Sequence, residues 1–109
     1  MTELLKHREL AAALRGRVAA AKGETDRSLR TAAVNRATGG EALAAPYDAL
    51  VVQIATDATG VTDEQVAAVR AAAGSDKAAF EIIMAAAIGA GLLRFERALR
   101  AIEDADAPR

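Results

Sequence analysis

The sequence contains no cysteine and no tryptophan, and it has only one histidine and two prolines. The absence of cysteine excludes disulfides, thiolate nucleophiles, zinc ribbons and iron–sulfur ligation. The single histidine, His7, cannot by itself supply a metal site or a Ser–His–Asp triad within one copy. We expect it to be a solvated helix residue. The composition therefore predicts no metal site and no cofactor.

The charge is nearly balanced, at −1, and it gives no reason to expect a polyanionic partner. Residues 1–45 carry eight Lys or Arg against five acids, and residues 46–109 carry six against ten. Neither half has the concentrated basic surface that nucleic-acid binding requires, so we expect no nucleic-acid partner. The longest nearly uncharged stretch, 82–93, is shorter than the ~20 residues of a membrane span. The N-terminus also lacks the order of a signal peptide. We expect a cytoplasmic protein that does not enter a membrane.

Large apolar side chains are scarce. Alanine accounts for 30 of the 109 residues, and only 27 residues are Val, Ile, Leu, Met, Phe or Tyr. Alanine contributes little transfer free energy per side chain, so the core of one copy is thin. A thin core is often completed by a partner, and the composition therefore favours self-association.

The periodicity predicts an all-α domain of about five helices, covering roughly residues 2–22, 26–38, 46–59, 63–73 and 76–103. Thr25 is the expected N-cap of the second helix, which has few large apolar residues and is the least certain to pack firmly. Thr62 and Gln65 form a capping box at the start of the fourth helix, and Gly74 ends it.

The fifth helix is the longest and the most apolar. Its predicted core-facing positions are Phe80, Ile83, Ala87, Gly91, Leu92, Phe95, Leu99 and Ile102. Because its first half is apolar almost all round, we expect part of it to be buried by another copy. Small residues four apart, such as Ala85 with Gly89, would allow helices to approach closely. The predicted oligomer core consists of Phe80, Ile83, Met84, Ala87, Gly91 and Phe95.

Acids are the remaining candidates for proton transfer. Asp57, Asp63 and Glu64 lie around the junction of the third and fourth helices. Negative charge in the first helical turn complements the helix dipole, and this favours a structural role for Asp63 and Glu64. Glu81 interrupts an apolar stretch, so it must reach solvent, carry a raised pKa or meet a cation. We favour an ion pair with Arg70 or Lys77 over a ligand-facing role.

The segment from Gly74 to Gly91 reads GSDKAAFEIIMAAAIGAG. It resembles a characteristic segment of the carboxymuconolactone decarboxylase and alkylhydroperoxidase-like family, with a glycine, a polar N-cap and a Glu-Ile-containing amphipathic run. The resemblance extends over about residues 46–104. It divides the chain into a basic N-terminal helical extension (1–45), a family-like core (46–104) and a frayed tail (105–109).

Thiol-dependent members of this family carry a Cys-x-x-Cys-x-x-x-His motif. The resemblance places its positions at Thr59, Thr62 and Val66, with a preceding family acid near Asp48. Thiol peroxidase chemistry is therefore excluded. The resemblance also implies assembly into a trimer, a hexamer or a similar ring.

A retained scaffold without its catalytic residues favours a non-enzymatic, homo-oligomeric binding or accessory protein, such as a companion subunit of an enzyme. The basic first helix, with Arg15 and Arg17, would offer a surface to an acidic protein partner. The alternative is a cysteine-independent enzyme of the decarboxylase or isomerase kind that uses carboxylates. Its candidate residues are Asp48, Asp57, Asp63 and Glu64.

Overall fold

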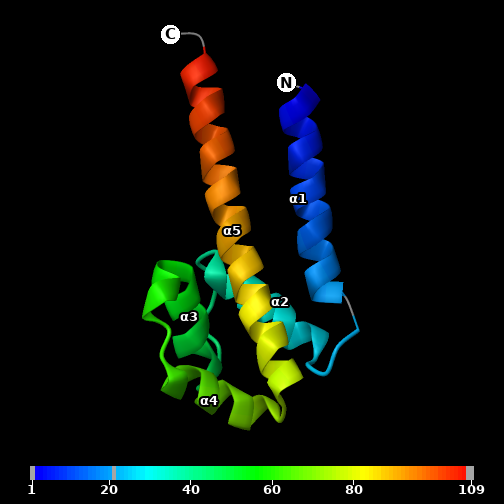
Figure 1. The fold of residues 1–109 in the computed structure, drawn as a ribbon. Coiled ribbons are helices and arrows are strands. Elements are labelled where there is room, and N and C mark those ends of the chain that lie inside the picture. The colour runs from blue at the N-terminus through cyan, green and yellow to red at the C-terminus, as the bar shows by residue number, and fades with distance from the viewer. Residues whose placement is uncertain (1, 21, 108–109) are drawn as a thin grey trace.

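The computed structural model describes residues 2–20 and 22–107, and within them the chain forms five α-helices, one short 3-10 helix and no strand (Figure 1). The elements in chain order are α1 (Thr2–Ala20), α2 (Arg27–Ala37), α3 (Tyr47–Asp57), η1 (Ala58–Gly60), α4 (Asp63–Ala73) and α5 (Asp76–Asp106). The predicted all-α class with five helices is confirmed.

Helix α5 is the longest helix, with 31 residues, and it contacts each of the other four α-helices. Helices α2, α3 and α4 gather around its N-terminal half, and α1 runs beside its C-terminal half (Figure 1). The longest dimension is 53 Å. The radius of gyration is 15.4 Å, whereas a compact domain of this length has about 13 Å. The α1–α5 pair therefore projects from the body of the fold.

Local capping signals determine where the helices meet. The Thr62 hydroxyl accepts a hydrogen bond from the Gln65 N–H at 3.1 Å, and the Gln65 side chain accepts one from the Thr62 N–H at 3.0 Å. Gly74 ends α4 with a φ of 99°, a left-handed conformation that favours glycine. The capping box and the glycine stop are both confirmed.

Two predicted boundaries are wrong. Asp26, and not Thr25, is the N-cap of α2, because the Thr25 hydroxyl donates to Glu81 instead. Helix α5 continues through Asp106, so the first part of the predicted frayed tail, 105–109, is helical. Residues 108 and 109 lie outside the described residues.

Helix α2 packs firmly although it has few large apolar residues, because small side chains let it approach α5 closely. Its Ala33, Val34 and Ala37 are buried in the same core as Leu50 of α3 and Ile82 of α5. Residues 27–37 of the predicted N-terminal extension thus contribute to the core of the fold.

The core-facing side of α5 also differs from the predicted stripe. The buried positions of this helix are Ala78, Ala79, Ile82, Ala85, Ala86, Gly89, Ala90 and Leu99. Phe80, by contrast, is 59% exposed, and Met84 is 40% exposed. Leu99 is confirmed as a core position and Ile83 packs against the core, but Phe80, Ala87, Gly91 and Ile102 are exposed, so that part of the predicted stripe is wrong for one copy. A helix that is apolar all round does not mark one side by periodicity.

Helices α2 and α5 approach each other closely at Gly89. A Cβ added there would lie 2.7 Å from the Val34 carbonyl oxygen and 3.0 Å from the Ala37 Cβ. The contact between α2 and α5 therefore requires a residue without a side chain at position 89. The expectation that Ala85 and Gly89 allow close helix packing is confirmed.

Candidate functional site

Glu81 lies at the meeting point of α2, α5 and the loop that precedes α2. Its Oε1 accepts hydrogen bonds from the Thr25 N–H at 3.0 Å and the Thr25 hydroxyl at 2.7 Å, and its Oε2 accepts one from the Glu24 N–H at 2.9 Å. Arg30 Nη1 lies 3.6 Å from Oε1, and the two side chains are only 6% and 14% exposed. A Cβ at Gly23 would overlap the carboxylate, so Gly23 allows Glu81 to reach this position.

These contacts make Glu81 a structural anion. The hydrogen bond from the Thr25 N–H contributes most to lowering the pKa of Glu81 from 4.5 to about 2, with the Glu24 N–H, the Thr25 hydroxyl and Arg30 contributing further. The expected ion pair exists, but its cation is Arg30. The predicted partners are wrong, since Arg70 pairs with Asp76 instead. A carboxylate held ionised in this way does not serve as a general acid near neutral pH.

The four candidate acids do not form one site. Asp57 caps η1 by accepting from the Thr59 N–H at 3.2 Å, and Asp63 and Glu64 are exposed in the first turn of α4. Asp48 is in the first turn of α3 and Asp57 ends the helix, so about 13 Å of helix separates them.

Asp48 joins α3 to α2. It accepts from the Leu43 N–H at 2.9 Å and from Arg36 Nε at 2.9 Å. The Leu43 N–H, followed by Arg36, lowers the pKa of Asp48, which is the opposite of what a general acid requires. The arrangement of these acids gives no support to the carboxylate enzyme.

The three positions to which the expected resemblance assigns cysteine and histidine make local structural contacts. The Thr59 hydroxyl donates to Asp57 at 2.6 Å, Thr62 caps α4, and Val66 packs against the core. An N-cap such as Thr62 typically stabilises a fold by about 1 kcal/mol. Local contacts where η1 is followed by α4 therefore account for all three residues.

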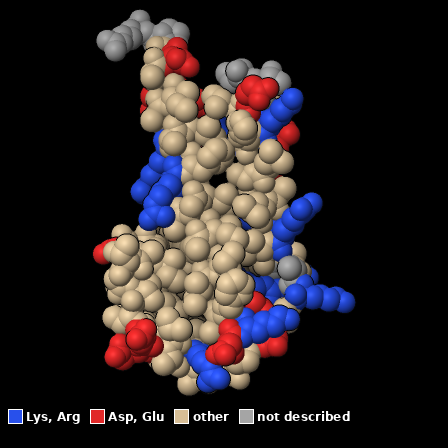
Figure 2. Space-filling model, viewed as in Figure 1, with Lys and Arg blue, Asp and Glu red and all other residues tan. Residues whose placement is uncertain are grey.

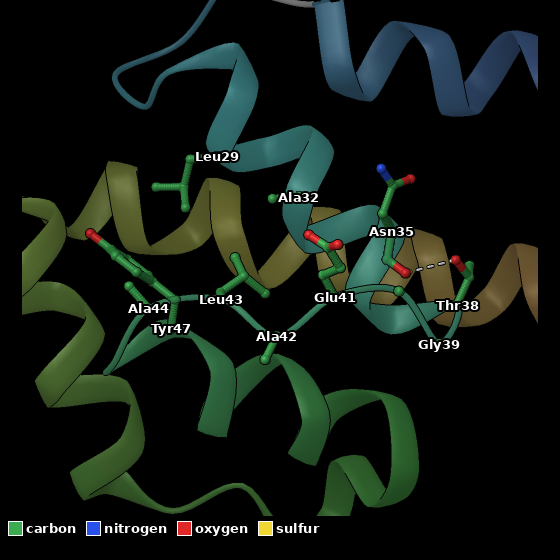
Figure 3. A pocket seen from close by; sticks show the side chains of 11 residues that line it. Leu29, Ala32, Asn35, Thr38, Gly39, Glu41, Ala42, Leu43, Ala44 and Tyr47 are labelled. Atoms are coloured by element: carbon green, nitrogen blue, oxygen red, sulfur yellow. Dashed lines mark hydrogen bonds between the residues drawn. The ribbon is translucent and has the colours of Figure 1, made fainter.

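A hollow lies between α2 and the segment that leads into α3, and we call it the α2–α3 pocket (Figure 3). Its volume is about 780 Å³, within the usual range for small-molecule sites. Leu29, Leu43 and Tyr47 supply apolar surface, and Glu41 and Asn35 lie toward the opposite end (Figure 3). Asn35 Oδ1 already accepts from Arg15 Nη2 at 2.6 Å. Among the residues that line the pocket, no nucleophile is paired with a base.

The predicted partner surface lies on α1. Arg15 and Arg17 are both exposed, and Arg15 is also the residue that contacts Asn35. Figure 2 shows Lys and Arg side chains along the edge of the molecule where α1 lies. His7 is exposed on the same helix. Among the residues that the structure describes, no three His, Cys, Asp or Glu side chains are grouped to hold a metal ion.

The second large surface feature is the face of α5 that points away from the core. Phe80, Met84, Ala87 and Gly91 are all exposed on it, whereas Ile83 and Phe95 are partly buried. By length and composition α5 could cross a membrane, a criterion that the core helix of a folded domain also meets. Of the six residues in the predicted oligomer core, four are therefore exposed in one copy and the other two are partly covered within it.

Sequence reasoning missed the α2–α3 pocket, the ion pair of Arg36 with Asp48, and the choice of Arg30 as the partner of Glu81. Arg30 and Arg36 could have indicated these pairs, because a charged residue in a helix whose inner side is otherwise small and apolar needs an acidic partner. No family model matches this chain, and no curated protein or solved structure is significantly similar to it.

Proposed function

We propose that this chain is a non-catalytic, self-associating binding protein that acts as a homo-oligomeric accessory subunit. The observation that carries the proposal is the exposed apolar face of α5, where Phe80 is 59% exposed and Met84 is 40% exposed. Large apolar side chains clustered on one exposed face typically indicate an interaction surface. A thin core and an elongated shape support the same proposal.

The chemistry of the polar groups supports the non-catalytic part of the proposal. The pKa values of Glu81 and Asp48 are lowered, Asp57 caps η1, and Asp63 and Glu64 are exposed in the first turn of α4. Residues 46–104 resemble the carboxymuconolactone decarboxylase family, but threonines occupy the cysteine positions. A protein of this kind would still form the oligomer of the family and would lack its thiol reaction. On that scaffold the assembly would be a trimer or a hexamer.

Self-association is tested by the mass of the purified protein in solution. Because apolar surface on α5 leaves water when copies pair, we expect a particle whose mass is a multiple of 11.2 kDa. Sedimentation velocity across a wide range of protein concentration measures it. A particle with the mass of one chain at the highest concentration would contradict the proposal.

The accessory role is tested on α1. Native mass spectrometry of gently purified protein identifies the bound partner, which we expect to present an acidic surface to Arg15 and Arg17. Reversing both charges, R15E with R17E, is expected to weaken that complex by at least about tenfold, since complementary charges govern such encounters. Because Arg15 also contacts Asn35, R17E alone is the cleaner variant. Arg97→Glu on α5 is the control, and equal binding by R17E and R97E would remove this surface from the proposal.

A further inference from the structure

Apolar residues follow one line along the outer face of α5. They are Phe80, Met84, Ala87, Gly91, Phe95, Ala98 and Ile102, and we call this set the apolar stripe. Its spacing is four, three and four residues, repeated twice, which corresponds to an 11-residue repeat. Such a repeat drifts little around a nearly straight α-helix, so the stripe stays on one side for its whole length. Phe80, Met84 and Ile102 are 59%, 40% and 47% exposed.

Gly91 is at the centre of the stripe, and the fold of one copy does not require it. A Cβ added there would meet no atom within 4 Å, in contrast to Gly89 two residues earlier. Glycine inside a helix costs about 1 kcal/mol relative to alanine. A second helix backbone that approaches position 91 would account for a glycine there.

The order of side-chain sizes selects an antiparallel arrangement. A two-fold axis at Gly91 places Met84 opposite Ala98 and Ala87 opposite Phe95, so that large side chains meet small ones. It also places Phe80 opposite Ile102 at both ends. A parallel pair would instead put Met84 on Met84, Phe95 on Phe95 and Ala98 on Ala98, with alternating crowded and empty layers. Close packing without voids favours the antiparallel register.

Charge favours the same arrangement. The last turns of α5 carry Glu103, Asp104 and Asp106 and no basic residue in the final turn, which is unfavourable at the negative end of a helix dipole. In the antiparallel pair, position 77 lies opposite position 105, so the exposed Lys77 comes near Asp106 of the second copy, which is on the same side of α5 as the stripe. The acid beside Lys77, Asp76, is already paired with Arg70.

A shallow groove beside the stripe fits the same partner. It has a volume of about 260 Å³ and is lined by Phe80, Met84, Lys22, Lys77 and the Arg30–Glu81 ion pair, together with Val18 near the end of α1. In the antiparallel pair, the C-terminal part of the second α5, with its apolar Ile102 and its terminal acids, crosses this position. The apolar and basic lining therefore matches the segment that would cover it.

We propose that two copies of this chain pair through the apolar stripe, with their α5 helices antiparallel about a two-fold axis at Gly91. This inference rests on the proposed self-association and specifies its surface and symmetry. A two-fold contact produces even numbers of copies, as in a dimer or a hexamer, whereas a plain cyclic trimer contains no such contact.

Because the chain has no cysteine, introduced cysteines report the pairing directly. M84C and A98C are made as separate full-length variants, mixed, allowed to exchange and oxidised. The antiparallel register brings residue 84 of one copy opposite residue 98 of the other. We therefore expect a disulfide-linked dimer in the mixture and little in either variant alone. Cross-linking of each variant alone would indicate parallel helices and would overturn the proposal.

Glycine substitutions supply an independent test. G91A is expected to weaken association by about tenfold or more, because the new methyl group separates the two backbones. Gly16→Ala is the matched control, since Gly16 is also inside a helix and its Cβ would meet no atom within 4 Å. Circular dichroism checks that both variants remain helical.

The outcomes separate this inference from the proposed function. An oligomer that is unaffected by G91A and forms no 84–98 cross-link would overturn the stripe as the interface and leave self-association intact. A protein that is monomeric throughout would contradict both. A monomer that sediments with phosphatidylcholine vesicles, and loses this property as F80E, would assign the stripe to a membrane surface and overturn the pairing.

Discussion

Replacing Glu81 with glutamine is expected to lower the free energy of unfolding by about 3 kcal/mol at neutral pH, because breaking a buried ion pair leaves its partner charge uncompensated. Glutamine has nearly the same shape but only one oxygen to accept the three hydrogen bonds from Glu24 and Thr25. Arg30, whose side chain is 6% exposed, would lose its counter-charge. Guanidinium or urea denaturation measures the change.

The pH dependence of the free energy of unfolding tests the same ion pair. The pKa of Glu81 is about 2 in the folded protein and 4.5 ordinarily, so the folded state favours the ionised form. The resulting stabilisation is fully present above about pH 4.5, and it is lost as the pH falls toward 2. Wild-type stability should therefore decrease across this window, and E81Q should lack this part of the decrease.

Glu96→Gln is the control on the same helix. Glu96 is 41% exposed and meets Arg8 and Arg100 at 4.0 and 3.5 Å. Exposed pairs of this kind contribute at most about 1 kcal/mol. If E81Q and E96Q lowered stability equally, Glu81 would not be the anchor that its contacts imply.

Much of the fold was predictable because the signals for helix ends are local. The Thr62–Gln65 capping box and Gly74 depend on neighbours within one turn, and both lie where predicted. Thr25 shows the limit of such signals, because its hydroxyl is used by Glu81, which is distant in the sequence. Asp26 caps α2 in its place.

The side of α5 that faces the core could not be predicted for a physical reason. Periodicity identifies a face only when the other face is polar, and the first half of α5 is apolar all round. In the structure α2 packs where side chains are smallest, around Ala85, Gly89 and Ala90, which leaves Phe80 and Met84 outside. The need of Glu81 for a cation was predictable, but the choice of Arg30 depends on how α2 packs against α5.

The α2–α3 pocket was beyond sequence reasoning because a loop forms most of its wall. The residues between Thr38 and Tyr47 follow a path fixed by tertiary contacts, including the hydrogen bond from the Leu43 N–H to Asp48. Neither hydrophobic period nor turn chemistry specifies such a path. The acids Asp57, Asp63 and Glu64 were predicted near one junction, and they do lie there, but as helix caps and first-turn residues at the surface.

Gly89→Ala is expected to lower the free energy of unfolding by about 1–3 kcal/mol, the usual cost of overpacking a core. The added methyl group would meet the Val34 backbone at 2.7 Å and the Ala37 Cβ at 3.0 Å, and backbone cannot move aside as a flexible side chain does. Helices α2 and α5 would separate, which also loosens the Arg30–Glu81 pair. Denaturation at one fixed protein concentration measures the loss.

The control for Gly89 has the opposite expected sign. Gly16→Ala in α1 adds the same methyl group where no atom lies within 4 Å, so the better helix propensity of alanine should stabilise the protein by up to about 1 kcal/mol. If G89A also stabilised the protein, helix propensity would outweigh the contact, and α2 would not approach α5 as closely as the structure shows. Opposite signs at the two glycines would establish that backbone contact, and not residue type, decides where glycine is required in this alanine-rich fold.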